Sequence, residues 1–160
     1  MYKYVFIDLD DTIWDFHANA KLSLHDMFID RELGRYFENF EEFFRIYAKR
    51  NIELWEAYGK GEITKEFLMS ERFRYPLAKM GVDDRELAEE IGIQYLDILP
   101  TKTALMPYAK EILDYLEMKG LHYIIACRFN NRIKYSLTHE RKWIELTDGL
   151  EISETIYQAN

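Results

Sequence analysis

Apolar and polar residues follow one another in blocks along this chain of 160 residues, and the blocks predict where strands and helices lie. The first block is an apolar run at residues 4–7 that ends in acidic residues. Such a run, bounded by polar residues, is typical of a strand buried on both faces of a parallel sheet. A second apolar run, at 121–126, follows a helical pattern that ends at Gly120, so a second buried strand is predicted there.

Between these two strands the apolar residues recur at three- and four-residue spacing, which predicts helices almost throughout. Gly34 and the Gly59-Lys60-Gly61 stretch are expected to end the first two helices. We interpret the many aromatic residues of this block as mostly its own hydrophobic core. The expected helices cover 17–33, 40–58, a segment from an N-cap at Thr64 towards Pro76, a segment from Asp83 or Asp84 through Leu96, and 108–119.

Three carboxylates follow the first strand directly, at Asp8, Asp10 and Asp11. Ligands of parallel sheets bind beyond the carboxyl ends of the strands, and residues two apart share a face, so Asp8 and Asp10 are expected to point at one spot with Asp11 turned away. Such a pair suits Mg²⁺ or a shared proton, and one aspartate there can form an aspartyl-phosphate while the other acts as acid and base. The simpler interpretation is a strand that ends in a solvated acidic turn.

The string Phe6-Ile7-Asp8-Leu9-Asp10-Asp11-Thr12-Ile13-Trp14 resembles the first motif of the haloacid dehalogenase superfamily, and most closely that of phosphatases similar to the bacterial pyrimidine 5′-nucleotidases. The resemblance implies that Asp8 is the phosphate-accepting nucleophile and Asp10 the general acid/base. It assigns Thr12 to the substrate-binding turn, where it orients the acid/base. Asp8 and the backbone carbonyl of Asp10 would bind Mg²⁺. Dehalogenases proper lack the second aspartate, so Asp10 favours phosphate chemistry.

The fold class that the resemblance implies is α/β, with a Rossmann-like parallel sheet core and an inserted all-helical cap domain. We expect residues 1–15 and 100–160 to form the core and residues 16–99 to form the cap. The core is expected to be incomplete at its C-terminal end. A truncated or altered reading frame, an artefact, a degenerate relative, or completion by another chain would each explain this.

The later motifs of the family match poorly. The second strand should end in a serine or threonine, but Ala126 stands where that hydroxyl belongs, and Arg128 stands where a glycine would let the backbone approach phosphate. Neither the downstream lysine nor the acidic pair of the metal site is found. Lys134 and Lys142 are available, but they lie in a predicted helix too early in the chain order. Asp148, Glu151 and Glu154 are acidic, but they also precede the expected position, in or near a predicted strand at 150–155.

The charge and composition of the chain limit the classes of partner that it is expected to bind. The chain has 21 basic and 29 acidic residues, a net charge of −8 that disfavours a nucleic-acid groove but leaves a small phosphorylated metabolite as a ligand. Cys127 is the one cysteine, and with no signal peptide it indicates the cytoplasm. No apolar run approaches the ~20 residues of a membrane span, so no membrane is expected. An open sheet edge would favour a homodimer.

These observations lead to one main hypothesis and one alternative. The main hypothesis is a Mg²⁺-dependent phosphomonoester hydrolase that acts through an aspartyl-phosphate, with a nucleoside monophosphate as the substrate that the family match favours. Arg72 and Arg74 in the helical block are candidate phosphate or base contacts, although solvated helix residues are the simpler interpretation. The alternative is a catalytically weak or inactive phosphate- or metal-binding module, or a truncated product.

Overall fold

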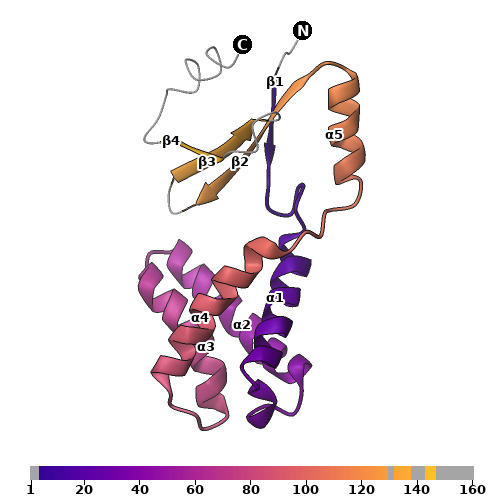
Figure 1. Ribbon diagram of the computed structural model, residues 1–160. Helices are drawn as coiled ribbons and strands as arrows, with labels where there is room; N and C mark the ends of the chain where they lie inside the picture. Colours follow the sequence, from indigo (N-terminus) through magenta and orange to yellow (C-terminus); the bar gives the residue numbers. More distant parts are fainter. Residues whose placement is uncertain (1–3, 130–131, 138–142, 147–160) are drawn as a thin grey trace. The chain divides into compact units, whose positions relative to one another are not determined.

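The computed structural model describes residues 4–129, 132–137 and 143–146. Contacts divide the chain into two compact units, one made of residues 1–16 and 104–160 and the other of residues 17–103 (Figure 1). In its described part, the first unit contains the strands and helix α5 (Ala109–Met118), and the second unit is built of helices. No helix in the described part of the chain is long and apolar enough to cross a membrane.

The helical unit contains the predicted helices, and their N-termini are held by side-chain caps. The Thr64 hydroxyl accepts a hydrogen bond from the Phe67 amide at 3.2 Å, so this predicted cap is confirmed. Of the two predicted alternatives Asp83 and Asp84, Asp84 is the cap, because its carboxylate accepts a hydrogen bond from the Leu87 amide at 2.9 Å. Asn39 caps a third helix in the same way. The elements are α1 (Phe16–Asp30), η1 (Leu33–Arg35), α2 (Phe40–Gly59), α3 (Lys65–Lys79), α4 (Arg85–Ile98) and η2 (Leu99–Thr101).

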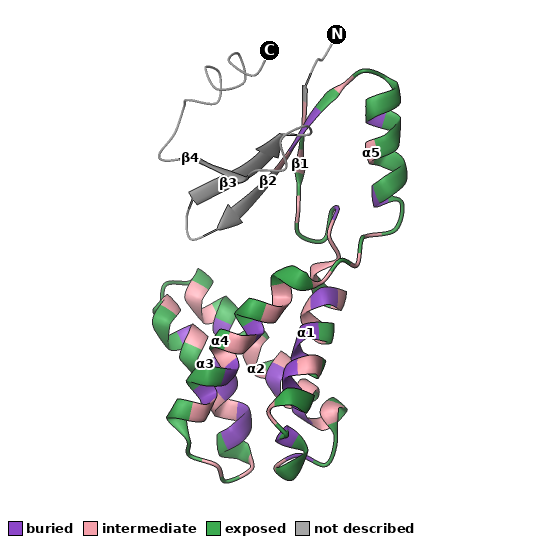
Figure 2. Cartoon of the chain, viewed as in Figure 1, coloured by how far each residue is buried: buried purple, intermediate pink, exposed green. Residues whose placement is uncertain are grey.

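A continuous aromatic core joins these helices. Ring centroids lie 5.2 Å apart for Phe37 and Phe43, 5.9 Å for Phe43 and Tyr47, and 5.2 Å for Tyr47 and Phe73. Tyr95 of α4 extends the series, 5.7 Å from Phe73. The buried residues lie on the inner faces of α1 to α4 (Figure 2), so the interpretation of the aromatic residues as core is confirmed.

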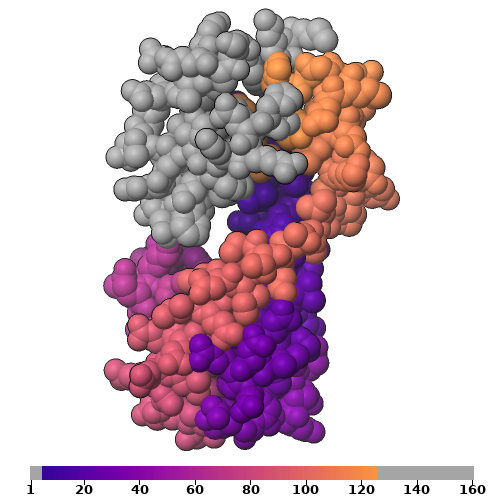
Figure 3. Space-filling view, viewed as in Figure 1, coloured from indigo at the N-terminus to yellow at the C-terminus, as the bar shows by residue number. Residues whose placement is uncertain are grey.

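Polar contacts tie α1 to α4 at the surface of the helical unit. Arg31 lies just after α1 and donates hydrogen bonds to Glu90 and Gln94 of α4. Gln94 in turn donates to Asp30 at 3.1 Å. The two helices lie side by side in the space-filling view (Figure 3).

Two helix ends differ from the predictions. The prediction that Gly34 ends the first helix is wrong: α1 already ends at Asp30, and Gly34 lies inside a short 3-10 turn at 33–35. Helix α3 passes through Pro76 and ends at Lys79. Proline lacks the N–H that would bond the preceding turn, but its fixed φ suits a helix and its ring is fully buried in the core, which offsets that loss.

The other unit is built on a parallel pair of strands, β1 (Tyr4–Asp8) and β2 (His122–Phe129). Their register runs from Tyr4 opposite His122 to Asp8 opposite Ala126. Helix α5 (Ala109–Met118) precedes β2 and contacts it. The two predicted apolar strands are therefore confirmed, and so is the α/β fold class.

The sheet continues in a way that the sequence analysis missed. Strand β2 runs on to Phe129 and pairs antiparallel with β3 (Arg132–Leu137), which pairs antiparallel with β4 (Trp143–Leu146). The helix predicted around Lys134 is therefore wrong. Only two residues separate Phe129 from Arg132, and a connection that short permits only antiparallel strands. Lys142, Asp148, Glu151, Glu154 and the predicted strand at 150–155 lie outside the described residues.

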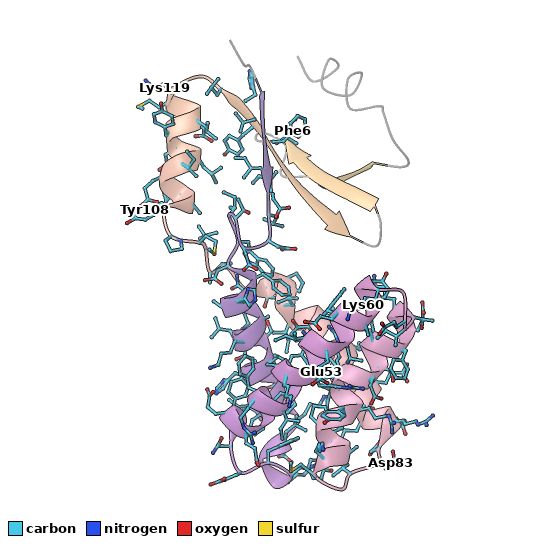
Figure 4. All side chains as sticks on the ribbon, turned by 180° about the vertical axis from the view of Figure 1, so that it is seen from behind. Phe6, Glu53, Lys60, Asp83, Tyr108 and Lys119 are labelled. Carbon is cyan, nitrogen blue, oxygen red and sulfur yellow. The ribbon has the colours of Figure 1, made fainter. Side chains whose placement is uncertain are left out.

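Strand β1 is not buried on both faces, which corrects the prediction. Val5 and Ile7 are half-buried, whereas Phe6 is 56% exposed and lies on the side of β1 away from α5 (Figure 4). Helix α5 buries Leu116 but leaves Met118 73% exposed. The apolar run correctly predicted the position of the strand. Burial of the second face of β1 depends on residues outside that run, so the run could not predict it.

Candidate active site

A tight turn at the carboxyl end of β1 carries the predicted site. Directly after Asp8, the Leu9 carbonyl accepts hydrogen bonds from the amides of Ile13 at 3.0 Å and Trp14 at 2.9 Å. The Asp11 amide donates to the Trp14 carbonyl at 2.8 Å. The backbone therefore folds back on itself within five residues and stops the strand at the carboxylates.

A distant segment supports this turn. The Asp15 amide donates to the Ala104 carbonyl at 3.0 Å, and the Met106 amide donates to the Ile13 carbonyl at 3.0 Å. Ile13 itself is buried. These contacts join residues some ninety positions apart, so no local sequence pattern could have identified them.

Asp11 has a left-handed backbone, with φ of 53°. Aspartate tolerates this conformation better than most residues, and non-glycine residues that adopt it gather at functional sites. Strand β1 ends at Asp8, and the left-handed residue lies inside the turn that follows. The strand alternation from which we expected Asp10 to share a face with Asp8 and Asp11 to turn away therefore does not apply beyond Asp8.

Asp8 and Asp11 both act on the carboxyl group of Asp10. The pKa of Asp10 is raised, first by partial burial of its carboxyl group and then by the negative charges of Asp8 and Asp11. Asp10 is exposed as a whole residue, so only the carboxyl end is desolvated. Asp11 is therefore close enough to act on Asp10, a contribution that the sequence analysis did not assign to it. Thr12 lies in the same turn and is exposed.

The neighbouring strand presents no hydroxyl at this level. Ala126 is the register partner of Asp8, which is where the family resemblance called for a serine or threonine. Strand β2 then continues through Cys127 and Arg128 instead of ending in a loop. The extended strand therefore occupies the chain positions that would form a phosphate-binding loop in the resembling family.

The donor set of the turn fits part of a Mg²⁺ site. Carboxylate and carbonyl oxygens are the ligands that this ion prefers, and Asp8 and Asp10 supply them at one end of β1. Among residues 4–129, 132–137 and 143–146, however, no group of three or more acidic, histidine or cysteine side chains could hold a metal. The described residues thus offer two acidic ligands at most.

Known proteins were compared with the chain to test its resemblance to the haloacid dehalogenase superfamily. No family model matches the chain. The chain is 27% identical over 126 residues to YfnB of Bacillus subtilis (strain 168), which is named as a HAD-hydrolase, and the match covers 78% of this chain and 51% of the relative. A crystal structure of YfnB bound to magnesium shares the fold with a TM-score of 0.68 and 24% identity, covering 79% of this chain and 52% of that chain.

This chain thus spans about half the length of the relative that it matches. The comparisons do not test the roles of Asp8, Asp10 and Thr12 or the narrower likeness to pyrimidine 5′-nucleotidases, so these stay predictions. The sequence match and the shared fold together confirm the resemblance of this chain to the haloacid dehalogenase superfamily hydrolases, as the motif at residues 6–14 predicted.

Proposed function

We propose that this chain carries the nucleophile and the acid/base of a Mg²⁺-dependent phosphomonoester hydrolase. The observation that carries the proposal is the turn after β1, where Asp8 and Asp10 follow the strand and the pKa of Asp10 is raised by burial and by neighbouring charges. Perturbed carboxyl groups are typical of catalytic sites. The likeness to a magnesium-bound HAD-hydrolase supports the same function.

The first half-reaction transfers the phosphoryl group to the enzyme. A carboxylate oxygen of Asp8 attacks phosphorus, and the bond from phosphorus to the leaving oxygen breaks. Asp10, in its protonated form, gives its proton to that leaving oxygen. The raised pKa of Asp10 suits this step, because the carboxyl group keeps its proton to a higher pH than an ordinary aspartate.

The second half-reaction releases phosphate. Asp10, now ionised, takes a proton from a water molecule whose oxygen attacks the phosphorus of the aspartyl-phosphate. The bond from phosphorus to the Asp8 oxygen breaks, which restores the Asp8 carboxylate, while the proton taken from water leaves Asp10 protonated again. The two aspartates thus finish the cycle in the states in which they began it.

Magnesium would be held by a carboxylate oxygen of Asp8 and by the backbone carbonyl of Asp10. When bound, the ion supplies positive charge that offsets the carboxylates and the substrate phosphate. Because the described residues supply so few ligands, Mg²⁺ would keep most of its waters, and we expect weak binding.

The finer parts of the proposal rest on the first motif. We infer that the helical residues 16–99 act as a cap domain on a core of residues 1–15 and 100–160, and that the substrate is a small phosphorylated metabolite such as a nucleoside monophosphate. Thr12 would help to position it. A cytoplasmic location and a homodimer formed through an open sheet edge remain parts of this proposal.

A second candidate function is an inactive or weakly active module that binds phosphate or metal without turnover. The observation that favours it is the register that places Ala126 opposite Asp8, because alanine cannot donate a hydrogen bond to phosphate. The continuation of β2 beyond that point removes a loop that could present backbone amides.

Hydrolysis of p-nitrophenyl phosphate with Mg²⁺ separates the two candidates. The wild type should turn over, and Asp8→Asn should lose about a thousandfold or more, because an amide has no anionic oxygen for attack. Asp97→Asn, at an exposed position on α4, is the matched control and should keep the wild-type rate. Equal rates for Asp8→Asn and the wild type would rule out the aspartyl-phosphate mechanism. Phosphate binding without turnover in the wild type would favour the second candidate.

A further inference from the structure

Arg72 is the most unusual residue of the helical unit. It lies in the middle of α3 and is only 5% exposed, so the interpretation of Arg72 as a solvated helix residue is wrong. Arg74, two residues along, is partly exposed and bonds Glu71 at 3.0 Å, as a surface arginine usually does. A buried arginine normally has an acidic partner, because an unpaired charge in the interior is costly.

The guanidinium of Arg72 has one edge without a partner. Its Nε and Nη2 atoms are both buried and neither makes a hydrogen bond. These two nitrogens lie on the same edge of the planar group, where two parallel N–H bonds match a carboxylate or a phosphate. The adjacent acid, Glu71, is engaged by Arg74 and by Arg50, the latter at 3.8 Å.

The groups around Arg72 do not supply a negative charge. Its guanidinium lies 4.9 Å from the Phe73 ring and 5.2 Å from the Tyr95 ring, contacts that offset only part of the cost of burial. Arg72 and Tyr95 both donate towards the Tyr47 hydroxyl. Burial raises the pKa of Tyr47 in spite of the Arg72 charge, so Tyr47 stays neutral and cannot serve as a counter-ion.

A further polar atom lies one turn along α2. The Oδ1 atom of Asn51 is buried and has no hydrogen-bond partner, and Asn51 follows Tyr47 by four residues, so both lie on the same face of the helix. Unsatisfied buried polar atoms are rare, and each one calls for a missing partner. A water molecule could satisfy single N–H groups here, but it would leave the full charge of Arg72 uncompensated.

We propose that the helical unit binds a small oxyanion, a phosphate or carboxylate group, on the free edge of the Arg72 guanidinium between α2, α3 and α4. The anion supplies the negative charge that the described part of this unit does not place beside Arg72, and it accepts hydrogen bonds from Nε and Nη2. The Tyr47 and Tyr95 hydroxyls border the site. The proposal is independent of the hydrolase function, because none of these residues belongs to the turn after β1.

Nuclear magnetic resonance of the arginine side chains tests this proposal on the full chain. With ¹⁵N-labelled protein and a chelator to remove metal, inorganic phosphate and then acetate are titrated while the Arg72 Nε–Hε signal is followed. A saturable shift with phosphate only, with acetate only, or with both supports the site and identifies the group that it accepts. An Arg72 signal that moves with neither anion overturns the proposal.

Three variants make the result specific. Arg72→Lys keeps the charge but loses the two-nitrogen edge and the Arg72 signal itself, so anion binding is followed in this variant and in the wild type by the backbone amide signals of Tyr47 and Tyr95. The substitution should weaken anion binding about tenfold or more. The matched control Arg74→Met removes an arginine that already has acidic partners and should leave the affinity unchanged. Asp8→Asn should also leave it unchanged, which separates this site from the proposed catalytic turn. Wild-type affinity in Arg72→Lys would contradict the proposal.

Discussion

The core of the helical unit and the turn after β1 are built on opposite principles. In the helical unit, the apolar core is formed by side chains that pack against one another: the rings of Phe37, Phe43 and Tyr47 lie 5.2–5.9 Å apart, and Phe43 is fully buried. In the turn, like charges at Asp8, Asp10 and Asp11 stand together and the pKa of Asp10 is raised by the burial and charge that result. The first arrangement stabilises a fold. The second is unfavourable by itself, which is typical of a site that awaits a ligand.

The largest expected effect comes from the aromatic core. Phe43→Ala should lower the free energy of unfolding by about 3–5 kcal/mol, because it removes a buried ring and leaves a cavity. Phe6→Ala is the contrasting variant and should change stability by less than about 0.5 kcal/mol, since Phe6 is already 56% exposed. Urea denaturation followed by far-ultraviolet circular dichroism measures both. Similar losses for the two variants would remove the contrast.

A helix cap gives the next largest effect. Thr64→Ala should lower the free energy of unfolding by about 1 kcal/mol, because the Phe67 amide loses its acceptor at the start of α3. Thr64→Ser keeps the hydroxyl and should stay close to the wild type. The same denaturation experiment applies. A loss for Thr64→Ser as large as that for Thr64→Ala would show that the hydroxyl is not the source of the effect.

In the turn, removing a charge should have the opposite effect on stability and raise the free energy of unfolding. The raised pKa of Asp10 means that the folded state disfavours the ionised form, so the penalty is full above the folded pKa and absent below the unfolded pKa. Asp10→Asn should therefore raise the unfolding free energy slightly at pH 7. The gain over the wild type should disappear at acidic pH, where Asp10 is protonated in both states. A loss of stability at pH 7 would contradict this account.

The smallest expected effect is a shift in the pKa of Asp10. Asp11→Asn removes a charge that raises the pKa of Asp10, so that pKa should fall towards its ordinary value. Asparagine tolerates the left-handed backbone at this position, where φ is 53°, so the turn should persist. Carboxyl ¹³C resonance titration measures the change. In a hydrolysis assay, the basic limb of the pH profile should move to lower pH, because less Asp10 stays protonated.

Local patterns were sufficient for the parts of the fold that local physics determines. The cap at Thr64, a cap at Asp83 or Asp84, the strand before Asp8 and the second apolar strand all followed from residue types and spacing. Strand β3 was missed although its alternation of apolar and polar residues, with Ile133 first, was a usable signal.

Other features depend on tertiary contacts that no local pattern carries. Pro76 stays inside α3 because its ring is buried, and Arg72 is buried because residues of α2 and α4 surround it. In the candidate site, Asp8 and Asp10 were identified from the motif alone. The effect of Asp11 on Asp10 was not, because strand alternation ends at Asp8 and the backbone of Asp11 is left-handed.

The central claim is that Asp8 is the phosphate-accepting nucleophile, and trapping the covalent intermediate tests it most directly. The protein is mixed with a phosphomonoester and Mg²⁺, quenched in acid within the turnover time, digested and examined by mass spectrometry. The account predicts a phosphoryl group on Asp8 in the wild type and none in Asp8→Asn. Turnover without a phosphorylated Asp8, or phosphorylation of another residue at the same level in both proteins, would contradict the claim.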